Sequence, residues 1–228
     1  MDAAEVTYSE GRWRLLDELR SEAAAMMEPL VEAHVEPLVY GSIARGDVKR
    51  GSDIDIYVPS PPSPTLIEAT LERRGVKLSH REIIQATPSY AAKAYLYTGD
   101  RRGYSYPLVY LKSNEAEFYA FAGSLSHGGL TQGLRVPGVD KRLMLIEPTA
   151  EGHRESPVKG QEGPVASKLG VDIRIVLERV RTLERRGRVG RTGVYLKREL
   201  ARDEDVSTVF NELASGKPAL RRRLRKRK

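Results

Sequence analysis

A short run of alternating acidic and apolar residues, 53–58, constrains the fold more than any other feature of the sequence. Successive side chains of a β-strand point to opposite faces, so Asp53 and Asp55 share one face while Ile54 and Ile56 share the other. The pattern predicts a strand that turns its isoleucines into the core and presents two carboxylates side by side.

A Gly-Ser pair lies shortly before this strand. Residues 37–40 are typical of a short buried strand, which Gly41 ends, and residues 43–45 are typical of a first helical turn. Such a turn points backbone N–H groups and the Ser42 hydroxyl at one spot, where a helix dipole also favours negative charge. Gly41 has no Cβ to keep a phosphate away, and Arg45 can grip phosphate oxygens with two N–H groups. The pattern predicts a triphosphate cradle.

The two aspartates predict a divalent cation beside that cradle. Neighbouring carboxylates repel each other unless a cation lies between them. Mg²⁺ prefers oxygen ligands together with substrate phosphates, and such ions assist phosphoryl transfer by neutralising a leaving pyrophosphate. We therefore expect Mg²⁺, or Mn²⁺ in its place, with Asp53 and Asp55 as ligands.

The joined pattern of residues 41–46 and 52–55, Gly-Ser-x-x-Arg-Gly and then Ser-Asp-x-Asp, resembles the signature of the DNA polymerase beta superfamily of nucleotidyltransferases, especially its minimal bacterial and archaeal members. The likeness is good over about residues 25–90 and looser over the rest of the first part of the chain. It implies transfer of a nucleoside monophosphate from ATP or another NTP to an acceptor, with release of pyrophosphate. It also implies that Gly41 and Ser42 bind the triphosphate, that Arg45 contacts phosphate, and that Asp53 and Asp55 ligate metal.

The same resemblance implies a third carboxylate on a neighbouring strand, where many minimal members carry Asp-x-Val-Thr-Pro. This chain has Glu82 at the start of Glu-Ile-Ile-Gln-Ala-Thr-Pro, with Glu for Asp and two more residues before Thr-Pro. Glu82 is the predicted third catalytic residue and metal ligand. Asp100, Glu115 and Glu117 are the alternatives.

Other polar residues near the motif are predicted to be bystanders. The sequence predicts an exposed linker over Asp47, Lys49 and Arg50, and it predicts that Lys112 is solvated. The histidines show no metal-ligand spacing; they are His34, His80, His127 and His153.

Periodicity and turn signals predict an α/β (α+β) chain, a mixed sheet flanked by helices. The expected helices are 9–27, 65–74 (Thr65 capping, with Glu68 in a capping box), 115–122, 162–169 and 172–186. The expected strands are 37–40, 53–58 and 82–86, with a hairpin over 94–111 and a two-stranded wing over 189–200.

The sequence changes character after a segment rich in Pro, Gly and charge, 147–163. We therefore predict a nucleotidyltransferase domain over 1–147, a small winged helix-turn-helix-like domain over 148–214 and a basic tail over 215–228. The net charge of +7 comes from the last eight residues, which hold seven basic side chains; without them 31 basic residues balance 31 acidic ones. This asymmetry favours a polyanion, RNA or DNA, near the C-terminal end.

Residues 162–186 carry apolar and basic side chains where a helix-turn-helix needs them. Val176, Val180 and Leu183 form one stripe, and Asp172 caps the second helix. Arginines on another face could contact nucleic-acid phosphates or base edges; these candidates are Arg174, Arg181, Arg185, Arg188 and Arg191. The other interpretation is a helical module that packs on the first domain or dimerises, its arginines solvated.

The composition favours a cytoplasmic protein with no membrane contact. It has no cysteine, no apolar run long enough to span a bilayer and no secretory signal. The leading prediction is a nucleotidyltransferase with NTP as substrate and RNA as a candidate acceptor. A nucleic-acid-binding regulator with an inactive, NTP-sensing domain is the second, and a toxin–antitoxin-type protein modifier the third.

Overall fold

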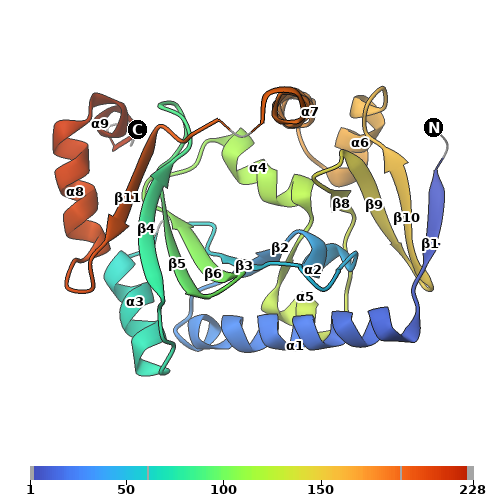
Figure 1. The fold of residues 1–228 in the computed structure, drawn as a ribbon, viewed down its shortest axis with the longest axis horizontal. Helices are drawn as coiled ribbons and strands as arrows, with labels where there is room; N and C mark the ends of the chain where they lie inside the picture. The colour runs from blue at the N-terminus through green and yellow to red at the C-terminus, as the bar shows by residue number, and fades with distance from the viewer. Residues whose placement is uncertain (1–2, 61, 191, 225–228) are drawn as a thin grey trace.

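The structure is a computed structural model that describes residues 3–60, 62–190 and 192–224. It has a mixed α/β fold built on two sheets (Figure 1). The larger sheet has the strand order β11-β4-β5-β6-β3-β2-β7. Its strands are β2 (Leu38–Tyr40), β3 (Ile54–Tyr57), β4 (His80–Gln85), β5 (Lys93–Gly99), β6 (Arg102–Pro107), β7 (Ser124–Ser126) and β11 (Leu196–Leu200).

The strand β3 lies inside this sheet, as its alternation requires. It pairs antiparallel with β2 and parallel with β6. Ile54 and Ile56 are fully buried, in the same core as Leu16 and Met27 of the long N-terminal helix, which runs beneath the sheet (Figure 1). The other face of β3 is left for Asp55.

The smaller sheet closes the other end of the molecule, with the order β1-β10-β9-β8. Its strands are β1 (Ala4–Thr7), β8 (Gly138–Val139), β9 (Met144–Thr149) and β10 (Gly152–Pro157). The N-terminal β1 pairs antiparallel with β10, about 150 residues later in the chain. Such long-range pairing cannot be read from local sequence patterns.

The helices lie on both faces of the sheets and around their ends (Figure 1). They are α1 (Glu10–Glu32), α2 (Ser42–Arg45), α3 (Pro64–Arg73), α4 (Ser113–Ala122), α5 (His127–Thr131), α6 (Glu162–Leu169), α7 (Ile173–Val189), α8 (Val206–Gly216) and α9 (Pro218–Leu224). Two expectations need correction here. Helix α1 continues to Glu32 with Pro29 in its last turn, and α3 begins after Ser63 rather than being capped by Thr65.

Two apolar clusters stabilise the fold. The first joins α1, α3, the larger sheet and the C-terminal α8, whose Val206, Val209 and Phe210 belong to it. The second joins α4, β9, α6 and α7, with Phe121 and Val176 among its members. The first cluster thus joins helices from both halves of the sequence, whereas the second is built from residues of the second half.

The two helices expected over 162–169 and 172–186 are present as α6 and α7, and the helix-turn-helix assignment stays a prediction. Gly170 takes the left-handed conformation after α6, and the Asp172 side chain accepts a hydrogen bond from the backbone of Arg174 at the start of α7. Val176 and Val180 are buried, whereas Leu183 is only half-buried.

The two-stranded wing is wrong. Among the described residues of 189–200 there is one strand, β11 (Leu196–Leu200), which pairs antiparallel with β4 of the larger sheet. Leu196 lies opposite Gln85, and Glu199 opposite Glu82. Without β11, β4 would be an edge strand with unpaired backbone N–H and C=O groups. β11 provides the partners for these groups.

The division of the chain at 147/148 stays a prediction. β9 and β10 form a hairpin across that position, and β11 joins a sheet that otherwise consists of residues before it. Of the predicted basic tail, 218–224 form α9, whose Arg223 side chain is almost buried and pairs with Glu115. Residues 225–228 lie outside the described part.

Candidate functional site

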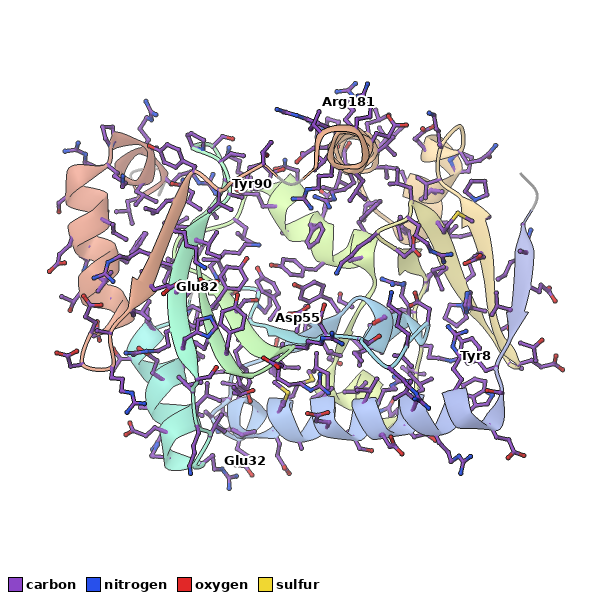
Figure 2. The ribbon with its side chains drawn as sticks, viewed as in Figure 1. Tyr8, Glu32, Asp55, Glu82, Tyr90 and Arg181 are labelled. Carbon is purple, nitrogen blue, oxygen red and sulfur yellow. The ribbon has the colours of Figure 1, made fainter. Side chains whose placement is uncertain are left out.

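The two aspartates of the motif occupy the start of β3. Asp53 directly precedes the strand and Asp55 is its second residue, so both project from the face opposite the isoleucines. Figure 2 shows Asp55 near the middle of the molecule, between the strands of the larger sheet and α4. Both side chains are reached by solvent.

The surroundings of Asp55 disfavour its charged form. It is open to water, yet protein lies around it on most sides. Burial is the first cause that raises its pKa to about 6, the charge of Asp53 is the second, and Lys141 acts in the opposite direction. A carboxylate in this state gains from a divalent cation, which would offset both the desolvation and the repulsion.

Lys141, which the sequence did not single out, is a cationic side chain close to the two aspartates. Its Nζ lies 3.8 Å from Oδ2 of Asp53, and its side chain is largely exposed. It comes from the turn between β8 and β9, in the smaller sheet, some 90 residues beyond the motif. No local signal could have placed it at the aspartates.

Gly41 has the backbone conformation that the cradle requires. Its φ of 82° and ψ of −143° are accessible almost only to glycine, and a Cβ built there would meet nothing within 4 Å. The space beside Gly41 is therefore open. Ser42 follows at the first helical position, and its hydroxyl donates to Oγ of Ser52, which directly precedes Asp53. The phosphate motif and the acidic motif are thus linked side chain to side chain.

Helix α2 is a single turn of four residues. The helix dipole invoked for phosphate binding is correspondingly small, since it grows with the number of aligned peptide units. The backbone N–H groups of the turn and the Ser42 hydroxyl are the donors that a phosphate would meet.

Arg45 has other partners than the predicted phosphate. Its side chain is buried; Nε and Nη2 donate to the two carboxylate oxygens of Asp47 at 3.0 Å, and Nη1 donates to the Ala122 carbonyl at 2.6 Å. The expectation that Asp47 is an exposed linker residue is wrong, because its side chain is 10% exposed and holds Arg45. Arg45 ties the turn to the end of α4 and so positions the cradle.

Glu82 lies on the same face of the sheet as Asp55 but away from it. β5 and β6 separate β4 from β3 (Figure 2), which puts the backbones roughly 14 Å apart in a flat sheet. Its carboxylate is buried; Oε1 accepts from the Tyr97 hydroxyl at 2.8 Å and Oε2 pairs with Nζ of Lys197 at 2.9 Å. The structure does not bring the predicted third ligand to the aspartates.

The strand next to β3 on that side is β6, and it has no carboxylate to offer. Gly103 lies opposite Asp55, and Ser105 lies opposite Tyr57. Over the described ranges, no three His, Cys, Asp or Glu side chains are grouped so that they could hold a metal ion. In the described part of the chain, no third acidic side chain joins Asp53 and Asp55 in such a group.

The alternatives to Glu82 are also placed elsewhere. Asp100 is exposed in the turn between β5 and β6. Glu115 is buried and accepts hydrogen bonds from the backbones of Ala91 and Lys112 and from Arg223. Glu117 accepts from the backbone of Asp172.

A layer of aromatic rings closes the site beneath α4. Tyr57 of β3 stacks on Tyr119 of α4 with ring centroids 3.5 Å apart, and Tyr40 meets Tyr119 edge to face at 5.0 Å. Lys93 donates to the Tyr119 hydroxyl at 2.7 Å, and burial lowers the pKa of Lys93 to about 8. Tyr95, whose pKa is raised to about 12 by burial and then by the charge of Asp55, lies on the same sheet face. Scattered tyrosines of several strands gather here only in the fold.

The arginines predicted to bind nucleic acid lie mainly on the outer side of α7. Arg181, Arg185 and Arg188 are exposed, and Figure 2 shows Arg181 pointing away from the molecule. Arg174 is held by Asp172 through both Nε and Nη2. Arg191 lies outside the described residues. The Arg174 side chain is nevertheless 82% exposed and lies seven residues before Arg181, so four of the five predicted arginines lie on one accessible helix surface.

The comparisons with known proteins agree with the motif. Residues 27–97 match the family model described as nucleotidyltransferase domain. Neither the comparison with curated proteins nor that with solved structures gives a match. The matched range includes the end of α1, the Gly41-Ser42 turn, both aspartates, Glu82 and most of β5. Over these residues, 71 of the 228 in the chain, the protein is similar to nucleotidyltransferase domains.

Proposed function

We propose that the protein transfers a nucleoside monophosphate from an NTP to an acceptor and releases pyrophosphate. The observation that carries this proposal is the pair Asp53 and Asp55 beside the open Gly41 turn, in a segment matched by the nucleotidyltransferase model. The triphosphate would lie against the N–H groups of the turn and the Ser42 hydroxyl.

Nucleotidyltransferase domains typically use divalent metals, and the aspartates suit one. They are oxygen ligands, they lie on one face of β3, and the raised pKa of Asp55 shows a charge that protein groups leave poorly compensated. Asp53 and Asp55 would hold Mg²⁺ or Mn²⁺. Such an ion supplies neutralisation of charge on the phosphates as the pyrophosphate leaves.

The chain's own residues supply orientation and further charge. Lys141, whose Nζ lies 3.8 Å from Asp53, would add positive charge beside the phosphates. Arg45 keeps the turn in place from behind, through Asp47 and the Ala122 carbonyl. The tyrosines beneath α4 exclude water from one side of the site.

The C-terminal half supports a nucleic acid as acceptor. The exposed Arg181, Arg185 and Arg188 of α7 form a basic helix surface that would bind phosphates. Among the described residues no helix combines the length and apolar character that a bilayer crossing needs.

A second function is favoured by one observation. β6 presents Gly103 and Ser105 toward the aspartates, where the resemblance implies a third carboxylate, so no side chain there can take the acceptor proton. This favours an NTP-sensing regulator that binds nucleic acid without turnover.

A label-transfer experiment separates the two. The purified protein would be incubated with each α-³²P-labelled NTP, Mg²⁺ or Mn²⁺ and a total RNA pool, while calorimetry measures NTP affinity. Label in RNA or protein together with released pyrophosphate supports the transferase. Metal-dependent NTP binding without label transfer supports the sensor, and absence of NTP binding contradicts both.

A further inference from the structure

Three aromatic side chains form a stack on the open sheet face, in line with Asp55. His80 of β4 lies opposite Tyr97 of β5, Tyr97 lies opposite Gly103 of β6, and Gly103 lies opposite Asp55. Residues paired across strands share a face, so Asp55, Tyr97 and His80 all project from the same side. Tyr95, two residues before Tyr97, projects there too.

The rings of these residues are almost parallel. His80 and Tyr97 have centroids 4.2 Å apart and planes inclined by 13°, while Tyr97 and Tyr95 have centroids 6.3 Å apart and planes inclined by 14°. His80 is exposed, and Tyr95 and Tyr97 are half-buried. We call His80, Tyr97 and Tyr95 the ring stack.

Glu82 and Lys197 fix the central ring. The Tyr97 hydroxyl donates to Oε1 of Glu82, and Oε2 of Glu82 pairs with Nζ of Lys197 from β11. Glu82 is 4% exposed, so this carboxylate is committed to its partners. Such a tie holds Tyr97 in one orientation before any ligand arrives, which reduces the entropy lost on binding.

No side chain separates the ring stack from Asp55 along this row. Gly103 is the residue between them, and a Cβ there would lie 3.3 Å from Cδ1 of Tyr97. The Tyr97 ring therefore leans over β6, toward the strand that carries the aspartates.

The direction of phosphoryl transfer decides which nucleotide reaches the ring stack. The Gly41-Ser42 turn follows β2, on one side of β3, and β6 and β5 lie on the other. The leaving and attacking oxygens stand roughly in line on opposite sides of the phosphorus. With the pyrophosphate at Gly41 and Ser42, the acceptor hydroxyl comes from the side of Tyr97.

We propose that His80, Tyr97 and Tyr95 bind by stacking the base of the terminal nucleotide of a single-stranded nucleic acid, which serves as the acceptor. This inference rests on the proposed function. Aromatic stacking suits a single strand, whose bases are open and whose binding tolerates different sequences. The exposed arginines of α7 match the charge of its backbone.

Binding measurements with the full chain test this site. Fluorescence anisotropy would follow a labelled random-sequence 12-mer of RNA and one of DNA, and calorimetry would follow Mg²⁺ with a non-hydrolysable NTP. Tyr97→Ala and His80→Ala should each weaken oligonucleotide binding roughly five- to 150-fold, because one stacked base is worth that much. NTP affinity should stay unchanged.

Two further variants serve as controls for these measurements. Tyr97→Phe retains the ring and loses only its hydrogen bond to Glu82, so it should bind the oligonucleotide far better than Tyr97→Ala. His34→Asn changes an exposed histidine after α1 with φ 56°, a conformation that Asn tolerates, and should change nothing. Since His80 is exposed, His80→Ala should fold even if Tyr97→Ala does not.

The outcomes are distinct. An equal loss of NTP affinity in Tyr97→Ala would place the NTP base on the ring stack and overturn the inference, as would unchanged oligonucleotide binding in both alanine variants. Wild-type protein that binds oligonucleotide but no metal–NTP would refute the proposed function and leave the ring stack as a nucleic-acid site alone.

Discussion

The larger sheet carries acidic side chains in two places on one face, and their environments are opposite. At β3, Asp53 and Asp55 lie side by side with the exposed Lys141 3.8 Å from Asp53, and the pKa of Asp55 is raised to about 6. At β4, Glu82 is buried with a hydroxyl on one oxygen and an ammonium group on the other. A satisfied carboxylate stabilises structure, whereas a poorly compensated pair is suited to binding a cation.

The largest expected effect separates these two places directly. Asp55→Ala should reduce metal-dependent NTP affinity by more than about 100-fold, because it removes a predicted ligand rather than an outer partner. Glu82→Gln should leave that affinity unchanged, because two strands, β5 and β6, separate Glu82 from the pair. Calorimetry with Mg²⁺ and a non-hydrolysable NTP measures both. A loss as large in Glu82→Gln would mean that Glu82 moves to the metal after all.

Acidity should weaken metal binding through Asp55. Protonated Asp55 cannot hold a cation, so Mg²⁺–NTP affinity should fall about tenfold per pH unit below about pH 6 and level off above pH 7. The raised pKa also means that the folded protein binds this proton more tightly than the unfolded chain does. Without metal, stability is therefore lost as the pH rises from about 4 through 6.

Asp55→Asn tests the stability side of this pH dependence. It should melt at a higher temperature than the wild type at pH 7.5, and at the same temperature at about pH 3, below the ordinary pKa of 3.8, where Asp55 is largely protonated in both states. Thermal melts of the metal-free proteins give the comparison. A variant that is less stable than the wild type at pH 7.5 would show that Asp55 is already compensated within the protein.

The Gly41 turn should be sensitive to a single methyl group. Gly41→Ala forces a non-glycine residue into the glycine-only conformation and should cost about 1–3 kcal/mol in the free energy of unfolding, measured by denaturant titration. Gly187→Ala is the matched control, since Gly187 is exposed within α7 and the change should stabilise the helix by about 0.5–1 kcal/mol. Equal effects would mean that the Gly41 backbone relaxes freely.

Lys141 should give the smallest effect. As an exposed partner it contributes at most about 1 kcal/mol, so Lys141→Ala should lower NTP affinity less than about fivefold. Lys77→Ala, at an exposed position before β4, should have no effect. A loss near that of Asp55→Ala would instead place Lys141 among the main phosphate-binding groups.

The sequence by itself determined the local geometry of the motif. Alternation placed Ile54 and Ile56 in the core and the two aspartates on the other face, and Gly41 fitted a conformation that few other residues adopt. Both follow from short-range rules, the pleat of a strand and the steric limits of φ and ψ. The pairing of α6 with α7 across Gly170 was predictable for the same reason.

Only the tertiary structure decided which distant residues meet that motif. It placed β6, with Gly103 and Ser105, beside β3, and it placed Glu82 on β4, two strands beyond β6. Arg45 pairs with Asp47 instead of facing the predicted phosphate site. β11 pairs with β4 instead of forming a wing. It also brought Lys141 from a second sheet to Asp53. Strand order and long-range pairing depend on which edges and apolar faces must be covered, and no local pattern in the chain encodes them.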